Sequence, residues 1–213
     1  MLYSGRKLWA DSRRQSEEGE APVGNRQALK LKGIRSSMLT FFFYCSVETG
    51  MGLWIASYGK ESLGMAAGAA ALCSSMYYAG ITIGRGLNGF LSMRCRDRTL
   101  IRCGVLLMTC AVLLMVLFRT PFMLMLCGIL FGLGCAPVYP CMIHGTPGRF
   151  GAKASQAATG LQMASAYTGS TFMPPLFGVI CGAIGMGFFP LLALVVCCML
   201  IAASEAVRKY QKD

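Results

Sequence analysis

The chain has 213 residues, of which 55% are hydrophobic and only 14% are charged, and its mean hydropathy is +0.55. Soluble domains carry about 25% charged residues, so this composition excludes an ordinary soluble globular protein. The formal net charge of +11 does not indicate a nucleic-acid-binding protein, because the basic residues lie between long apolar runs, as they do in multi-pass membrane proteins.

Six apolar runs follow one another along the chain, and each is long enough for a membrane-spanning helix, which needs about 20 residues. The predicted spans cover 37–58, 65–91, 99–118, 122–143, 155–182 and 186–206. The sequence therefore predicts an all-α membrane protein with a six-helix transmembrane bundle at 37–206. Residues 1–36 are predicted to form a cytoplasmic linker, either a solvated loop or one that ends in a short basic surface helix. Residues 207–213 are predicted to form a cytoplasmic tail.

The distribution of Lys and Arg sets the predicted orientation. An even number of spans places both termini on one side of the membrane, and all but two of the 20 basic residues then lie on that side. The exceptions are Lys60 and Arg119. Because cytoplasmic loops carry the excess of basic residues, both termini are predicted to be cytoplasmic.

Glu48 lies near the middle of the first predicted span, within the apolar stretch FFFYCSVETGMGLW. A charge at the bilayer centre costs at least about 2.5–3.5 kcal/mol, so such a residue is expected to face protein or water. Glu48 is therefore the leading candidate for binding a proton or a polar solute, and helical spacing places Tyr44 on the same face. The alternative is a protonated carboxyl that hydrogen-bonds to a neighbouring helix and serves only packing.

Polar side chains also occur in the second and fifth predicted spans. Tyr77 and Tyr78 lie near the middle of the second span, and Thr159 and Gln162 belong to a polar stripe along the fifth. A stripe of hydroxyls and amides suits a ligand rich in hydroxyl groups, and it equally suits hydrogen bonds between helices. The sequence leaves both interpretations open.

Glycines and prolines mark places where the spans are expected to approach closely or to bend. Gly84 and Gly89, near the inner end of the second span, are expected to allow tight helix packing. Prolines within helices remove intrahelical hydrogen bonds, and the resulting bends line cavities or act as gates in transporters. The prolines with this predicted role are Pro137, Pro140, Pro174 and Pro175.

The connection after the second span carries a cluster of charged residues. Arg85 is predicted to lie at the cytoplasmic interface beside Asp97 and further arginines. A charge cluster that joins two helices at the inner face would lock one conformation and break in the other. The alternative is simple anchoring to anionic lipid headgroups.

The eleven cysteines lie mostly inside apolar runs, and none forms a Cys-x-x-Cys pair. Only one histidine accompanies them. Neither a metal site nor a disulfide framework is predicted, because the ligand spacings that such sites use are absent. No cofactor is expected, and the absence of nucleophile or phosphate-binding motifs indicates that the protein is not an enzyme.

Four motifs together resemble the C-terminal half of a major facilitator superfamily transporter, and most closely the fucose-permease-like sugar:proton symporters of bacteria. These motifs are FFFYCSVETGMGLW, GRGLNGFLSMR, GLGCAPVYPCMIHGTPGRFG and LQMASAYTGSTFMPPLFG. The resemblance covers about residues 25–206 and implies the cell (inner) membrane. It also implies a fold of two six-helix halves that hold a solute between them and open alternately to each side. Glu48 matches the acidic position of the first span of this half, and Arg85 matches the inner-loop arginine.

The sequence is consistent with two functions. The first is proton-coupled transport of a small, sugar-like solute, with either a separate N-terminal six-helix half or a second copy of the chain as partner. The second is a truncated integral membrane protein that inserts but transports nothing. The other predicted partners are membrane lipid, the solute and protons, and nucleic acid is not among them.

Overall fold

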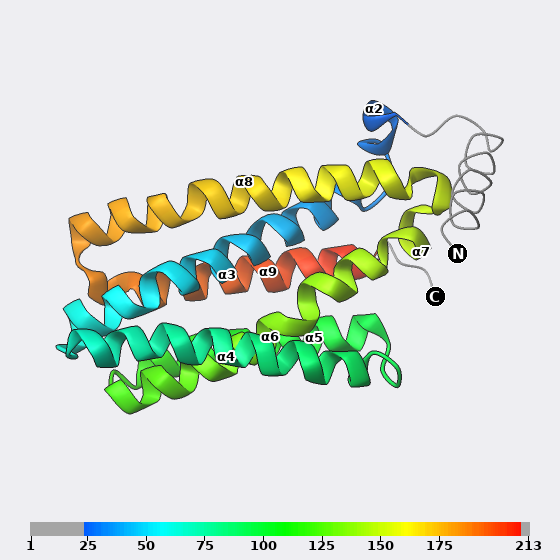
Figure 1. The fold of residues 1–213 in the computed structure, drawn as a ribbon. Coiled ribbons are helices and arrows are strands. Elements are labelled where there is room, and N and C mark those ends of the chain that lie inside the picture. The colour runs from blue at the N-terminus through cyan, green and yellow to red at the C-terminus, as the bar shows by residue number, and fades with distance from the viewer. Residues whose placement is uncertain (1–23, 210–213) are drawn as a thin grey trace, which may run out of the picture.

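The computed structural model describes residues 24–209, and almost all of them are helical (Figure 1). Among these residues, six long helices run back and forth: α3 (Ile34–Leu63), α4 (Ala67–Leu91), α5 (Asp97–Leu117), α6 (Pro121–His144), α8 (Ala152–Ile184) and α9 (Phe189–Lys209). The short elements are α2 (Asn25–Ala28), α7 (Thr146–Phe150) and the 3-10 helix η1 (Met186–Phe188). The remaining parts of the predicted linker and tail, residues 1–23 and 210–213, lie outside the described residues.

The long helices coincide with the predicted spans, with small differences at their ends. The largest difference is at α3, which continues through residues 59–63 instead of ending in a loop at 58. Lys60 and Glu61 are good helix formers, and the helix ends only at Gly64, whose φ of 64° is left-handed. Glycine adopts this conformation without a steric penalty, so the helix end follows the glycine rather than the charged residues.

Four helical segments of the described chain are long and apolar enough to cross a membrane. They are Ile34–Leu63, Asp97–Leu117, Pro121–His144 and Met186–Arg208. The helices α4 and α8 are of comparable length, but they carry more polar side chains. The structure is therefore all-helical with four clear spans, and the count of six spans stays a prediction.

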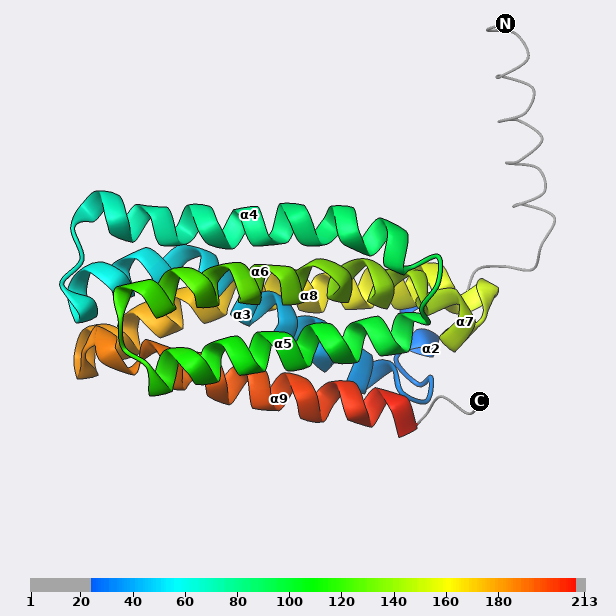
Figure 2. The same cartoon turned by 90° about the horizontal axis from the view of Figure 1, so that it is seen from below.

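The six long helices form two groups of three. α3 packs against α8 and α9, and α6 packs between α4 and α5. Contacts between α3 and α4, and between α5 and α9, join the two groups. In Figure 1 the first group lies above the second, and in Figure 2 the long helices run nearly side by side, with α2 and α7 at the end where α9 finishes.

Close backbone contacts hold α4 against α6. A Cβ built on Gly132 of α6 would collide with the carbonyl oxygen of Tyr77, so only glycine fits there. The tight packing predicted at Gly84 is confirmed, because its Cβ position lies 2.5 Å from the Cβ of Ala136. The same prediction was wrong for Gly89, which is exposed and has nothing within 4 Å of its Cβ position. Five residues after Gly84, the helix has turned by about 140°, and this face points away from α6.

The four predicted bend-forming prolines lie inside two of the long helices. Pro137 and Pro140 lie within α6, and Pro174 and Pro175 lie within α8. Both helices continue past their prolines, and the second half of α6 leaves the line of its first half on the way to α7 (Figure 1). The Pro174 carbonyl oxygen accepts a hydrogen bond of 2.9 Å from Nε1 of Trp54, which ties α8 to α3 at this point. A gating role for these prolines stays a prediction.

Candidate functional site

Glu48 lies near the middle of α3, and its side chain is half-buried. The Tyr44 hydroxyl and the Arg85 guanidinium both lie within electrostatic reach of its carboxyl group. Tyr44 belongs to the same helix, one turn earlier, and Arg85 belongs to α4. The carboxyl group therefore lies at a seam between helices, with polar groups from two of them close by.

Two buried tyrosines join three helices around this carboxyl group. The Tyr44 hydroxyl donates a hydrogen bond of 2.9 Å to the carbonyl oxygen of Cys135 in α6. The Tyr77 hydroxyl, from α4, donates a bond of 3.0 Å to the backbone carbonyl oxygen of Glu48. Both rings are 1% exposed. These bonds position α4 and α6 against the middle of α3. Neither bond involves the Glu48 carboxyl group.

Tyr78 follows Tyr77 in α4 and is exposed. Its ring is 55% exposed, and its centroid lies 4.9 Å from that of Tyr77. A Cβ built on Gly52 of α3 would lie 2.9 Å from the Tyr78 hydroxyl. The glycine therefore lets this phenol lie against α3, one turn beyond Glu48, where it presents both a hydroxyl group and an aromatic face.

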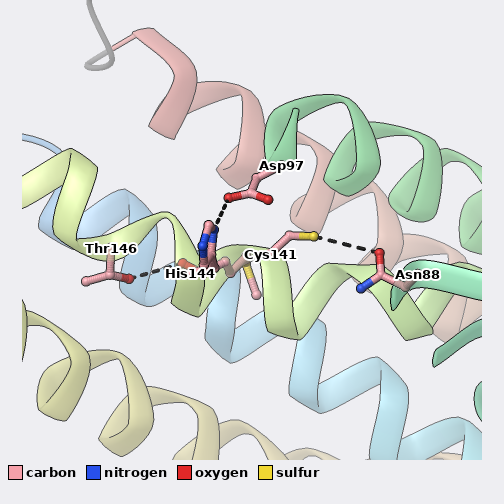
Figure 3. Close-up of polar contacts among 6 residues, drawn as sticks. Asn88, Asp97, Cys141, His144 and Thr146 are labelled. Carbon is pink, nitrogen blue, oxygen red and sulfur yellow. Dashed lines mark hydrogen bonds and ion pairs between the residues drawn. The ribbon is translucent and has the colours of Figure 1, made fainter. Parts of the chain in front are cut away.

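Asp97 lies beside a different residue from the one that the sequence indicated. Its Oδ2 atom is 2.7 Å from Nδ1 of His144, at the end of α6 (Figure 3). Arg85, which was expected beside Asp97, instead lies within reach of Glu48. His144 had no predicted role.

Gln162 is fully buried and joins helices. Its Nε2 donates a hydrogen bond of 2.7 Å to Oγ of Ser37 in α3, and its Oε1 accepts one of 3.0 Å from Oγ1 of Thr146 in α7. Of the two interpretations of the polar stripe, the hydrogen bond between helices is the one observed here. Ser37 precedes Glu48 by about 16 Å along the helix axis. Gln162, and the half-buried Thr159 nearby, therefore lie apart from the Glu48 group.

The inner end of the bundle contains a charge cluster whose members the sequence only partly indicated. Glu205 of α9 forms ion pairs of 3.0 Å with Arg102 and 2.9 Å with Arg208. Arg149 of α7 is half-buried, and burial, with a further contribution from the nearby Arg98, lowers the pKa of its guanidinium. A charge cluster that spans several helices is present, and its role as a conformational lock stays a prediction.

Within residues 24–209, no three His, Cys, Asp or Glu side chains come together in a way that could hold a metal ion. The eleven cysteines are free thiols. What the Glu48 group offers is a half-buried carboxyl group, tyrosine hydroxyls and a guanidinium. Such a set can exchange a proton and can hydrogen-bond a hydroxyl-bearing solute.

Comparison with known proteins identifies the family. The profile of the Major Facilitator Superfamily matches residues 37–212, and the chain belongs to this family. It is therefore a multi-pass membrane protein of a transporter family and not an enzyme. A search of curated proteins finds no match.

Two solved structures share the fold. One is a crystal structure of FucP, a Major Facilitator Superfamily transporter, in the outward conformation. It has a TM-score of 0.72 and 18% identity, over 86% of this chain and 44% of that chain. The other is a variant of the E. coli fucose:proton symporter FucP, with a TM-score of 0.74 and 17% identity, over 88% of this chain and 45% of that chain. The chain thus spans less than half the length of these proteins.

Proposed function

We propose that the chain is the C-terminal, six-helix half of a transporter that carries a small, sugar-like solute by proton-coupled alternating access. The observation that carries this proposal is the Glu48 group, in which a half-buried carboxyl lies at mid-helix beside Tyr44 and Arg85, with Tyr78 against Gly52 one turn further along α3. An ionisable group at this depth is expensive and is by default functional. One of the similar structures is described as a fucose:proton symporter, which supports the same class of solute.

In this proposal α4 and α8 also cross the membrane. Their residue ranges, Ala67–Leu91 and Ala152–Ile184, exceed the roughly 20 residues that a span needs. They run beside the four apolar helices (Figure 2), and their polar side chains are expected to face the solute pathway instead of lipid. Six spans return the chain to its starting side, and the excess of basic residues there supports cytoplasmic termini in the cell membrane.

The roles within the site follow from the exposure of each side chain. Glu48 takes up and releases the coupling proton, and Arg85 offers the carboxylate a counter-charge in one state. Tyr78 contacts the solute through its hydroxyl group and ring. Tyr44 and Tyr77 are buried and hydrogen-bonded to backbone, so they position the helices around the carboxyl group. The Pro-containing helices α6 and α8 provide the bending segments, and the inner charge cluster closes one state.

A partner half is expected on the exposed face of α8 and α4. Large side chains there are exposed to solvent in the isolated chain. On α8 they include Tyr167 (69% exposed), Phe172 (68%) and Val179 (71%). In this fold the solute lies between two six-helix halves, so this face fits either a separate N-terminal half or a second copy of the chain. Crosslinking from a Tyr167→Cys variant identifies which of the two is the neighbour in the membrane.

Uptake into proteoliposomes tests the proposal. The chain, with any partner that co-purifies, is supplied with labelled fucose and related sugars, with and without an inward proton gradient. Uptake is expected to follow the gradient, to be lost in Glu48→Gln, and to persist in Glu61→Gln, a control at the exposed outer end of the same helix. Uptake that ignores both the gradient and Glu48→Gln contradicts proton coupling. No uptake of any sugar in any arrangement supports instead a membrane protein that transports nothing.

A further inference from the structure

A hollow runs between α4 and α5, toward the basic end of the bundle. Its apolar part is a groove of about 260 Å³, walled by Leu87 and Leu91 of α4 and by Cys103 and Leu107 of α5, with Pro137 of α6 at its base. The groove exists because α4 and α5 each pack along α6 and hardly touch each other. Figure 2 shows α6 between them.

The groove continues into two polar hollows. Asn88 lines both the groove and an adjoining crevice of about 240 Å³. Ser92, Asp97 and His144 line both that crevice and a wider basin of about 630 Å³. In Figure 3, Cys141 points toward Asn88, and Asp97 points toward His144. The apolar groove and the two polar hollows therefore adjoin one another through shared lining residues.

The basin is strongly basic. Arg96, Arg98 and Arg149 line it, whereas its one acidic residue, Asp97, has its carboxylate 2.7 Å from the His144 ring. Burial and the proximity of Arg98 lower the pKa of Arg149, and the nearby Asp97 offsets part of this effect. Its Nε atom is buried without a hydrogen-bond partner among the described residues. The start of α5, at Asp97, adds the positive end of a helix dipole.

We propose that this hollow binds an anionic phospholipid, with the headgroup phosphate against Arg96, Arg98 and Arg149 and an acyl chain in the groove between α4 and α5. A soluble phosphate would use the basin but leave the groove empty. An apolar helix from another protein would fill the groove but would not use the basic basin. An anionic lipid has both parts in one molecule, and it is most abundant on the cytoplasmic side, where the proposed orientation places the basic end.

Lipid retention by the purified chain in detergent, followed by native mass spectrometry, tests this site. Phosphatidylglycerol is compared with phosphatidylcholine of identical acyl chains, and glycerol 3-phosphate serves as the soluble headgroup. Phosphatidylglycerol is expected to be retained preferentially, and millimolar glycerol 3-phosphate is expected not to displace it. Equal retention of the two lipids overturns the proposal. Displacement by glycerol 3-phosphate shows a free-phosphate site and also overturns it.

Matched variants test the two ends of the site separately. Arg96→Gln and Arg149→Gln are each expected to weaken phosphatidylglycerol retention about fivefold, whereas Arg94→Gln, on the same connection but outside the basin, leaves it unchanged. Arg96 is exposed, so its variant remains informative if Arg149→Gln fails to fold. Retention unaffected by Arg96→Gln overturns the headgroup contact.

The groove is tested by adding bulk on α5. Cys103→Phe fills the groove and is expected to weaken the retention of both lipids, whereas Cys110→Phe, exposed on the same helix outside the groove, leaves retention unchanged. Equal effects of the two substitutions overturn the acyl-chain contact. Retention is measured without transport, so a failure here is distinguishable from a failure of the proposed transport function.

Discussion

Substitutions of Gln162 test whether the polar stripe of α8 joins helices or binds solute. Its fully buried amide donates to Ser37 Oγ at 2.7 Å and accepts from Thr146 Oγ1 at 3.0 Å. Gln162→Met keeps the volume and removes both bonds. Hydrogen bonds between membrane helices contribute about 0.6 kcal/mol each on average and about 1.7 at most, so this variant should lose about 1–2 kcal/mol of unfolding free energy. Gln162→Ala should lose roughly 2 kcal/mol more, because it leaves a cavity.

Thermal unfolding in detergent measures this loss. A thiol-reactive fluorophore reports unfolding, because cysteines such as Cys127 and Cys197 are buried in the folded chain. For a chain of this length each kcal/mol lowers the Tm by about 2–4 °C, so Gln162→Met should lower it by roughly 2–8 °C. Gln156→Met, at an exposed position of the same helix, should leave the Tm unchanged. In a double-mutant cycle, Ser37→Ala should show coupling to Gln162 of about 0.6–1.7 kcal/mol.

The opposite pattern would refute this reasoning. If Gln162→Met keeps the Tm of the unsubstituted chain but abolishes uptake of the solute, the amide binds the solute in a state that opens this end of α8. If both the Tm and uptake are unchanged, the two hydrogen bonds contribute nothing measurable. Only a lowered Tm with measurable coupling to Ser37 supports a joint between α3, α7 and α8.

Three further predictions concern glycine contacts, tyrosines and ion pairs. Gly132→Ala should destabilise the chain by about 1–3 kcal/mol through collision with α4, whereas Gly89→Ala, in open space, should stabilise it by up to about 1 kcal/mol; the Tm values of the two variants decide. Tyr77→Phe should lower stability by about 1 kcal/mol through the lost bond to α3, and Tyr78→Phe should weaken solute uptake without changing the Tm. Glu205→Gln should cost less than about 1 kcal/mol, because its arginine pairs are partly exposed, and the cost should shrink when unfolding is repeated in high salt.

The helices could be predicted from the sequence because their signals are local. At the start of α6, the Thr120 side chain accepts a bond from the backbone N–H of Met123, and Pro121 occupies the first helical position. Both features are readable from the string RTP before an apolar run. The depth of Glu48 was readable in the same way, because a residue in the middle of an apolar run lies in the middle of its helix.

The partners of the polar side chains could not be predicted, because they depend on which helices become neighbours. Gln162 hydrogen-bonds to Ser37, which lies 125 residues away in the sequence. Asp97, at the start of α5, lies against His144, at the end of α6. Helical periodicity states only which residues share a face. It does not state which helix packs on that face, so a buried joint and an open binding site have the same sequence pattern.

The lower hydropathy of α4 and α8 also depends on what these helices face. A helix that faces lipid on its outer side must be apolar there, whereas one that faces a solute pathway or a second half need not be. Tyr78 and Tyr167, on these two helices, are large, exposed and polar at the tip. Such side chains suit a surface that another six helices cover or that water reaches. The two long helices that are not among the four clear apolar spans are therefore the ones expected to flank the solute. Glu48 lies on α3, which packs against both.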